Sequence, residues 1–301
     1  MFKTKQRKIT ASLLSVVMFL FMFSTSMVSA KELPTNCKAI SIVSKNLITG
    51  KEGRQTYFEG VEPGGKTSGF SNAFIPEQEP GGKSKRSILG TDDRFKVDNT
   101  TSFPYSAIAH MEMKWPNGKR YVGSAWMYGP NVAMTAGHCL YSIDNGGWPQ
   151  EIVIYPGRNG SSKPFGSVKA VTIHVPENYA NSEDIDSDWG LIELDKNIGN
   201  ETGYFGASWQ LDSLAGTEVS VTGYPGEKSR QMWQMNGPIR SSREYKIDYI
   251  MDTTGGQSGC PVYLEDDHIS VAIHTNGAFD GISNKATRIT KSIFDFMESF
   301  R

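Results

Sequence analysis

The sequence has few cysteines, and after its first thirty residues it has no long apolar run. Its three cysteines, Cys37, Cys139 and Cys260, are too few for a small disulfide-stapled scaffold. No later segment is apolar over the roughly 20 residues that a membrane-spanning helix needs. The chain also has no His-Glu-x-x-His motif, which argues against a zinc protease of that kind.

A basic excess is also missing. Residues 87–301 carry 18 basic and 26 acidic side chains, a net charge of −8 with histidine neutral. Because binding to phosphates requires a basic face, we expect no nucleic-acid partner. We also expect no metal or other cofactor, and a monomer.

The first thirty residues are typical of a secretory signal peptide. Four basic residues precede a mostly apolar stretch at 13–23, and small residues, Val28-Ser29-Ala30, follow it. This pattern predicts export of the protein and removal of residues 1–30. After that removal we expect no membrane association.

Residues 31–86 differ from the rest, with nine basic and six acidic residues. Two Pro-Gly-Gly words, at 63–65 and 80–82, indicate exposed and flexible chain. The segment ends in Lys83-Ser84-Lys85-Arg86, a site for a protease of basic specificity. We interpret 31–86 as a removable propeptide; a plain flexible spacer is the alternative.

From residue 87 onward, short apolar stretches alternate with turn words, which predicts an all-β sandwich or barrel. The last segment is different: Ile293, Phe296, Met297 and Phe300 have helical spacing, and Ser292 is placed to cap the start. We expect this helix to pack on the barrel. The predicted strands are 121–128, 151–155, 168–174, 190–194, 217–222, 249–252 and 269–274.

Three short motifs supply the parts of an acyl-transfer site. His138 follows Thr-Ala-Gly, Asp188 begins an apolar strand, and Ser258 lies among Gly255, Gly256 and Gly259. A serine hydroxyl needs a base, and the base needs a carboxylate to fix its tautomer. The glycines permit a turn whose N–H groups, assigned here to Gly256 and Ser258, can stabilise an oxyanion.

Each motif alone has an ordinary reading, as a packed histidine, a strand-end cap or a surface turn. Asp184 and Asp186 are rivals of Asp188, but neither directly precedes the apolar strand. The occurrence of all three in the order His, Asp, Ser favours catalysis. The order and the absence of Gly-x-Ser-x-Gly disfavour an α/β-hydrolase.

The chain resembles the trypsin/chymotrypsin-like serine proteases and, more narrowly, the bacterial glutamyl endopeptidases of bacillary type. The similar segments are 87–94, 101–105, 156–160, 253–259 and 274–277. The resemblance implies two six-stranded antiparallel β-barrels with a C-terminal α-helix. The first barrel would span residues 87–199, and the second, with the helix, residues 200–301.

The resemblance also implies that Thr253 and His274 read a glutamate side chain of protein and peptide substrates. Threonine and histidine can donate to a carboxylate without burying a permanent charge. Asp252 argues against specificity for glutamate, because trypsins carry their pocket aspartate at the same spacing before the serine. We expect Asp252 to point elsewhere; cleavage after Lys or Arg is the alternative.

Gln257 stands where chymotrypsin-like enzymes have an aspartate that pairs with the new amino terminus. We therefore expect the amino group of Ser87 to lie near the substrate pocket after a cut at Arg86. A Glu-specific enzyme should not make this cut, so an activating protease with basic specificity is expected. The rival reading is a catalytically inactive homologue that acts as a secreted binding protein.

Two cysteines remain in residues 87–301, which in an exported protein suggests a Cys139–Cys260 disulfide. Two buried free thiols are the alternative. Relatives often pair the cysteine after the histidine with one fifteen residues before the histidine. That position is Gly123 here, which puts the predicted bridge in question.

Overall fold

The computed structural model describes residues 39–58, 67–76, 93–277 and 283–301. All of them belong to one unit, Asn36–Arg301. The signal sequence, both Pro-Gly-Gly words and the Arg86–Ser87 site lie outside the described residues. No helix in the described ranges is long and apolar enough to cross a membrane.

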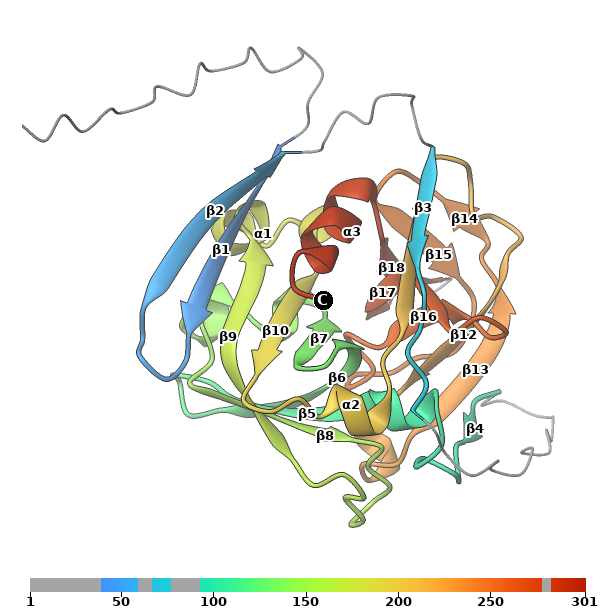
Figure 1. Ribbon diagram of the computed structural model, residues 1–301, viewed down its shortest axis with the longest axis horizontal. Helices are drawn as coiled ribbons and strands as arrows, with labels where there is room; N and C mark the ends of the chain where they lie inside the picture. The colour runs from blue at the N-terminus through green and yellow to red at the C-terminus, as the bar shows by residue number, and fades with distance from the viewer. Residues whose placement is uncertain (1–38, 59–66, 77–92, 278–282) are drawn as a thin grey trace, which may run out of the picture. The chain divides into compact units, whose positions relative to one another are not determined.

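Six strands of the first half close into an antiparallel barrel. Their order is β10-β7-β6-β5-β8-β9, and a further pairing between β10 and β9 completes the circle (Figure 1). In β8 every second residue is buried, so Ile152 and Ile154 face the interior. The strands are β5 Ile108–Lys114, β6 Arg120–Gly129, β7 Val132–Thr135, β8 Glu151–Pro156, β9 Val168–Pro176 and β10 Gly190–Leu194.

The second half forms an open sheet of similar strands. Its central order is β15-β18-β17-β16-β12-β13, and within the described residues no strand pairing joins β13 to β15. At this opening the amide of Asp252 donates to the sulfur of Met235 at 3.0 Å instead. The strands are β12 Glu218–Gly223, β13 Trp233–Pro238, β15 Lys246–Tyr249, β16 Pro261–Leu264, β17 Ile269–Gly277 and β18 Asn284–Arg288.

Three short strands complete this second sheet. Two-residue strands lie at its ends, where β4 (Phe95–Lys96) pairs with β13 and β14 (Ser241–Ser242) pairs with β15. The strand β11 (Gly206–Gln210) runs parallel to the start of β17. The prediction of a mostly-β chymotrypsin-like fold is confirmed, with one closed barrel and one half-barrel.

Parts of segment 31–86 form strands, which the sequence analysis did not predict. Strands β1 (Ala39–Asn46) and β2 (Glu52–Phe58) form a hairpin, and β1 pairs with β9 of the barrel. Strand β3 (Ser68–Ser71) pairs with β11 (Figure 1). In both places the backbone groups of the segment extend a sheet of the following region.

The predicted C-terminal helix exists as α3, Lys291–Glu298, and it buries Ile293, Phe296 and Met297. The ring of Phe296 lies 4.9 Å from that of Tyr57 in β2. The predicted cap was wrong by two residues: the side chain of Thr290, not Ser292, accepts from the backbone of the first turn. Two shorter helices, α1 (Glu177–Ser182) and α2 (Gly199–Thr202), lie in connections.

Candidate active site

Strand pairing brings His138 and Asp188 together. Thr135 at the end of β7 pairs with Gly190 at the start of β10, so the residues just beyond them are neighbours. The imidazole Nδ1 of His138 lies 2.9 Å from Asp188 Oδ2, and the His138 amide donates to Oδ1 at 2.9 Å. A Cβ at Gly137 would lie 3.0 Å from the Trp189 nitrogen, a tight contact, so this close approach favours glycine.

The histidine and the aspartate shift each other's titration. Burial disfavours charge on His138, but the nearby Asp188 carboxylate raises the pKa of His138 well above its usual value. Burial likewise opposes ionisation of Asp188, but the charge and hydrogen bonds of His138 lower the pKa of that carboxyl. The pair therefore stabilises an imidazolium beside a carboxylate.

Side chains of the second sheet donate hydrogen bonds to Asp188, and the sequence analysis did not predict these residues. Thr287 donates its hydroxyl to the Asp188 carbonyl at 2.7 Å, and Asn276 donates to Oδ2 at 3.5 Å. The ammonium of Lys246, which is 4% exposed, donates to the Thr287 hydroxyl at 2.8 Å. Burial lowers the pKa of Lys246 and Asp188 raises it. A lysine at a strand start gives no sequence signal of such burial.

Ser258 lies in a turn between β15 and β16. Two backbone hydrogen bonds fix the peptide that joins Ser258 to Gly259. The Ser124 N–H donates to the Ser258 carbonyl at 2.8 Å, and the Gly259 N–H donates to the His274 carbonyl at 2.7 Å. The Ser258 hydroxyl donates to the Thr275 carbonyl at 3.3 Å and is only half-buried. Cys139, directly after His138, has its sulfur 3.9 Å from the Ser258 carbonyl oxygen.

Gly256 has a φ of +99°, and a Cβ there would lie 2.6 Å from both the Gly226 nitrogen and the Tyr224 oxygen. Only glycine fits this position. Within the described residues, the amides of Gly256 and Ser258 donate to no other protein group. They are available for a ligand oxygen.

His274 lies on β17 and is 2% exposed. Burial, and then the charge of His138, lowers the pKa of His274 to about 3, so the ring is neutral at neutral pH. Its Nδ1 lies 2.5 Å from the hydroxyl of Tyr249, whose pKa burial raises well above its usual value. Tyr249 therefore donates, and the His274 proton resides on Nε2.

The other predicted pocket residues have different settings. Thr253 is half-buried, whereas Asp252 is exposed and accepts from the Asp93 amide at 3.4 Å. Ser87 lies outside the described residues.

His138, Asp188 and Ser258 lie within a match to the trypsin family that spans residues 95–295. The chain belongs to this family. It is 43% identical over 229 residues to the Glutamyl endopeptidase of Bacillus licheniformis, which covers 72% of this chain and 70% of the relative. The resemblance to glutamyl endopeptidases is confirmed, and this trypsin-family chain is a serine endopeptidase.

Two further likenesses complete the comparison. A Bacillus subtilis protein named "Extracellular metalloprotease" is 40% identical over 215 residues, or 69% of this chain and 68% of the relative. A protein metal site needs about three ligands, and the described residues hold no group of three His, Cys, Asp or Glu that would supply them. The solved structure of a Glu endopeptidase in complex with MPD superposes with a TM-score of 0.64 at 29% identity, covering 71% of this chain and 98% of that one.

The trypsin-family chain departs from our expectation at its cysteines. Cys139 and Cys260 are both buried and free, so the predicted disulfide was wrong. Cys139 belongs to the core of the first barrel and Cys260 to the core of the second sheet. Burial raises the pKa of the Cys260 thiol, which makes it unreactive.

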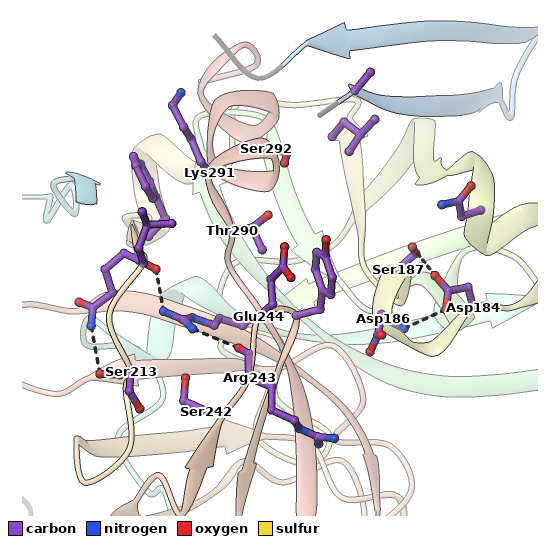
Figure 2. A pocket seen from close by; sticks show the side chains of 18 residues that line it. Asp184, Asp186, Ser187, Ser213, Ser242, Arg243, Glu244, Thr290, Lys291 and Ser292 are labelled. Carbon is purple, nitrogen blue, oxygen red and sulfur yellow. Dashed lines mark hydrogen bonds between the residues drawn. The ribbon is translucent and has the colours of Figure 1, made fainter. Parts of the chain in front are cut away.

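Figure 2 shows a cavity of about 880 Å³ whose lining residues do not include Ser258. Asp184, Asp186 and Ser187 line one side, and Arg243 and Glu244 line another. The rivals Asp184 and Asp186 therefore border this cavity, and neither hydrogen-bonds to His138 within the described residues. Sequence analysis did not detect it.

Proposed function

We propose that the protein is a secreted endopeptidase, made as a precursor, that cleaves peptide bonds after Glu and more weakly after Asp. Residues 1–30 are the signal and residues 31–86 are removed by a protease of basic specificity. The observation that carries the proposal is the His138–Asp188 hydrogen bond of 2.9 Å beside Ser258. The match to glutamyl endopeptidases supports the specificity.

The first step is acylation of Ser258. The neutral form of His138 is the base: its Nδ1 proton is donated to Asp188 and its Nε2 is unprotonated, and the raised pKa means that this form gains population as the pH rises. It takes the hydroxyl proton as Ser258 Oγ attacks the carbonyl carbon of the substrate. The resulting imidazolium is stabilised by the Asp188 carboxylate, the same interaction that raises the pKa of His138. The hydroxyl must first leave the Thr275 carbonyl, which is a rotation about one side-chain bond.

The tetrahedral intermediate carries an oxyanion, which accepts from the amides of Gly256 and Ser258. Each such donor is worth about 3 kcal/mol or more. The imidazolium of His138 then protonates the leaving amine. A water molecule, deprotonated by the same ring, hydrolyses the acyl-enzyme and regenerates Ser258.

The side chains that read Glu are neutral donors and not a buried arginine or lysine. Because Tyr249 fixes the His274 proton on Nε2, this ring is a donor suited to a carboxylate, and the Thr253 hydroxyl is a second. Asp252, which accepts from the Asp93 amide, does not oppose an acidic side chain in this role. The amino group of Ser87, freed by cleavage after Arg86, adds the compensating charge.

The experiment is digestion of a peptide library by matured protein, with Ser258→Ala as the matched control. We expect cuts after Glu, weaker cuts after Asp, and none from the control. Cuts mainly after Lys or Arg would overturn the specificity. The contact of Ser258 with Thr275 instead of His138 is the one observation that favours an inactive binding protein. Absence of cutting and of organophosphate labelling at Ser258 would establish that alternative.

A further inference from the structure

Arg94 connects the start of the trypsin-family region to the Ser258 turn. The residue is 8% exposed, and its Nη1 donates to Gln257 Oε1 at 2.9 Å and to the Thr254 hydroxyl at 3.1 Å. Its Nη2 donates to Glu227 Oε1 at 2.8 Å. The planar guanidinium thus bridges the serine turn and the neighbouring loop that carries Glu227.

The backbone around Arg94 is itself anchored. Residues 95–96 pair with β13, the Val97 amide donates to the Met232 carbonyl at 2.9 Å, and the Asp93 amide donates to Asp252. Arg94 is therefore held between fixed points. It reaches the turn from a defined position.

Gln257 connects the Arg94 side chain to the backbone of the turn. Its Oε1 also accepts from the Thr254 amide at 3.0 Å, and its own amide donates to the Thr254 carbonyl at 3.1 Å. The two bonds close residues 254–257 into a ring. Gln257 is 1% exposed, so loss of the Arg94 donor leaves its side-chain oxygen short of a partner in a buried site.

Glu227 fixes the other side of the same turn. It accepts from the Thr254 hydroxyl at 2.6 Å as well as from Arg94. Burial opposes its ionisation, but these hydrogen bonds lower the pKa of Glu227. The charged pair with Arg94 thus persists at neutral pH.

The restraint determines where the Gly256 N–H points. The Gly226 amide, next to Glu227, donates to the Gly255 carbonyl at 2.7 Å. In a trans peptide the C=O of one residue and the N–H of the next point in opposite directions. The Gly256 N–H is therefore directed away from Gly226. If the peptide rotated, one proposed oxyanion donor would be lost.

We propose that Arg94 is a positioning residue, which keeps the 255–256 peptide in the orientation that donates to the oxyanion. It acts through Gln257 on the turn and through Glu227 on the Gly226 loop. The proposal rests on the catalytic function proposed above. Arg94 is not one of the proposed catalytic residues Ser258, His138 and Asp188, and the proposal gives it a role in supporting them.

The test compares Arg94→Ala with Arg158→Ala. Arg158 is a matched control: its side chain is 5% exposed, as is that of Arg94, and its hydrogen bonds within the described residues go to Gly160, His110 and Glu112, not to residues 254–258. Matured variants are assayed for kcat, KM and Tm. We expect Arg94→Ala to lower kcat about 10- to 100-fold with KM within about 3-fold, since transition-state stabilisation is lost.

Two further readouts separate positioning from folding. Millimolar guanidinium ion should partly restore kcat of Arg94→Ala and leave Arg158→Ala unchanged. Arg94→Lys should be only partly active, because one ammonium cannot reproduce the guanidinium fork. If Arg94→Ala fails to fold, Glu227→Gln, at a half-exposed side chain, should still lower kcat without raising KM.

The inference is overturned if Arg94→Ala keeps the wild-type kcat, or if both alanine variants lose activity in step with their Tm. Wild-type protein that neither cleaves peptides nor reacts with an organophosphate would overturn the proposed function and this inference together. Wild-type protein that does both, with Arg94→Ala equal to its control, overturns the inference alone.

Discussion

The two halves of the catalytic region are held in different ways. His138 and Asp188 follow and precede strands of a closed barrel, and the pairing of Thr135 with Gly190 sets their distance. Ser258 lies in a turn of an open sheet, and part of its support comes from side chains of residues outside the central strands. Backbone register sets the approach of the proposed acid–base pair, whereas the turn of the proposed nucleophile combines backbone hydrogen bonds with side-chain contacts from outside its sheet.

This difference implies different weaknesses. The His138–Asp188 geometry should survive changes of side chain, so losses there should come from chemistry. The Ser258 turn should be sensitive to shape, because Gly256 has no room for a Cβ. Substitutions on each side test the distinction.

The largest effect is expected from Asp188→Asn. The amide keeps the shape of the carboxylate but cannot stabilise the imidazolium and favours the wrong tautomer, so kcat should fall about 10⁴-fold. Thermal unfolding should change little, because strand pairing sets the local structure. Steady-state kinetics with a chromogenic Glu substrate measure the loss. A fall of less than about tenfold would show that His138 does not depend on this carboxylate.

Gly256→Ala should be the next largest, with Gly255→Ala as its neighbour control. A Cβ at Gly256 meets two backbone atoms at 2.6 Å, whereas one at Gly255 meets nothing within 4 Å. The first change should rotate the peptide and lower kcat by about 10²- to 10³-fold, the cost of one oxyanion donor. Equal kcat values for the two variants would argue against the assigned donor.

The two free thiols give a stability comparison. A Cβ at Gly123 lies 3.1 Å from the Cys139 sulfur, so Gly123→Cys should form a disulfide and raise the free energy of unfolding by about 3 kcal/mol. In the second sheet, a Cβ at Gly223 lies 2.8 Å from that of Cys260, closer than a disulfide permits.

Gly223→Cys should therefore destabilise the protein without forming a bridge. Thiol counting and denaturant unfolding, with and without a reductant, measure both variants. Free thiols in Gly123→Cys, or a bridge in Gly223→Cys, would contradict the geometry of the two cores.

The smallest effect is expected from Lys246→Met. Burial raises the pKa of Asp188, while the charges of His138 and Lys246 lower it. Without the ammonium, the His138–Asp188 pair binds a proton more readily, so the acidic limb of kcat/KM should move to higher pH. A pH–rate profile measures this shift. Movement to lower pH would contradict the sign.

Four of the six strands of the first barrel, β6, β8, β9 and β10, were predicted, because each is a short apolar stretch between turn words. Residues 190–194 were predicted to the residue, and 151–155 to within one. The strand expected at 249–252 is instead Lys246–Tyr249: Ile250 is 62% exposed, so its apolar character misled the prediction. Local pattern does not reveal which apolar residue faces solvent.

The candidate site was predictable in its central parts and not in its supports. His138, Asp188 and Ser258 stand in distinctive local motifs, and the structure brings the first two into contact. The contacts of Lys246, Thr287 and Arg94 span sequence separations of 41, 99 and 163 residues, which no local motif records. The strands of segment 31–86 escaped notice because only Ile42 is buried in β1.

Those strands change the outcome of a cut after Arg86. Hydrogen bonds join β1 to β9 and β3 to β11, and neither set depends on the peptide bond at residue 86. Hydrolysis would thus leave a complex of two chains, and freeing the larger one would be a dissociation with its own equilibrium constant. Once free, β9 and β11 would each present an unpaired edge. The released peptide is complementary to both, so the yield of separated enzyme should increase with dilution.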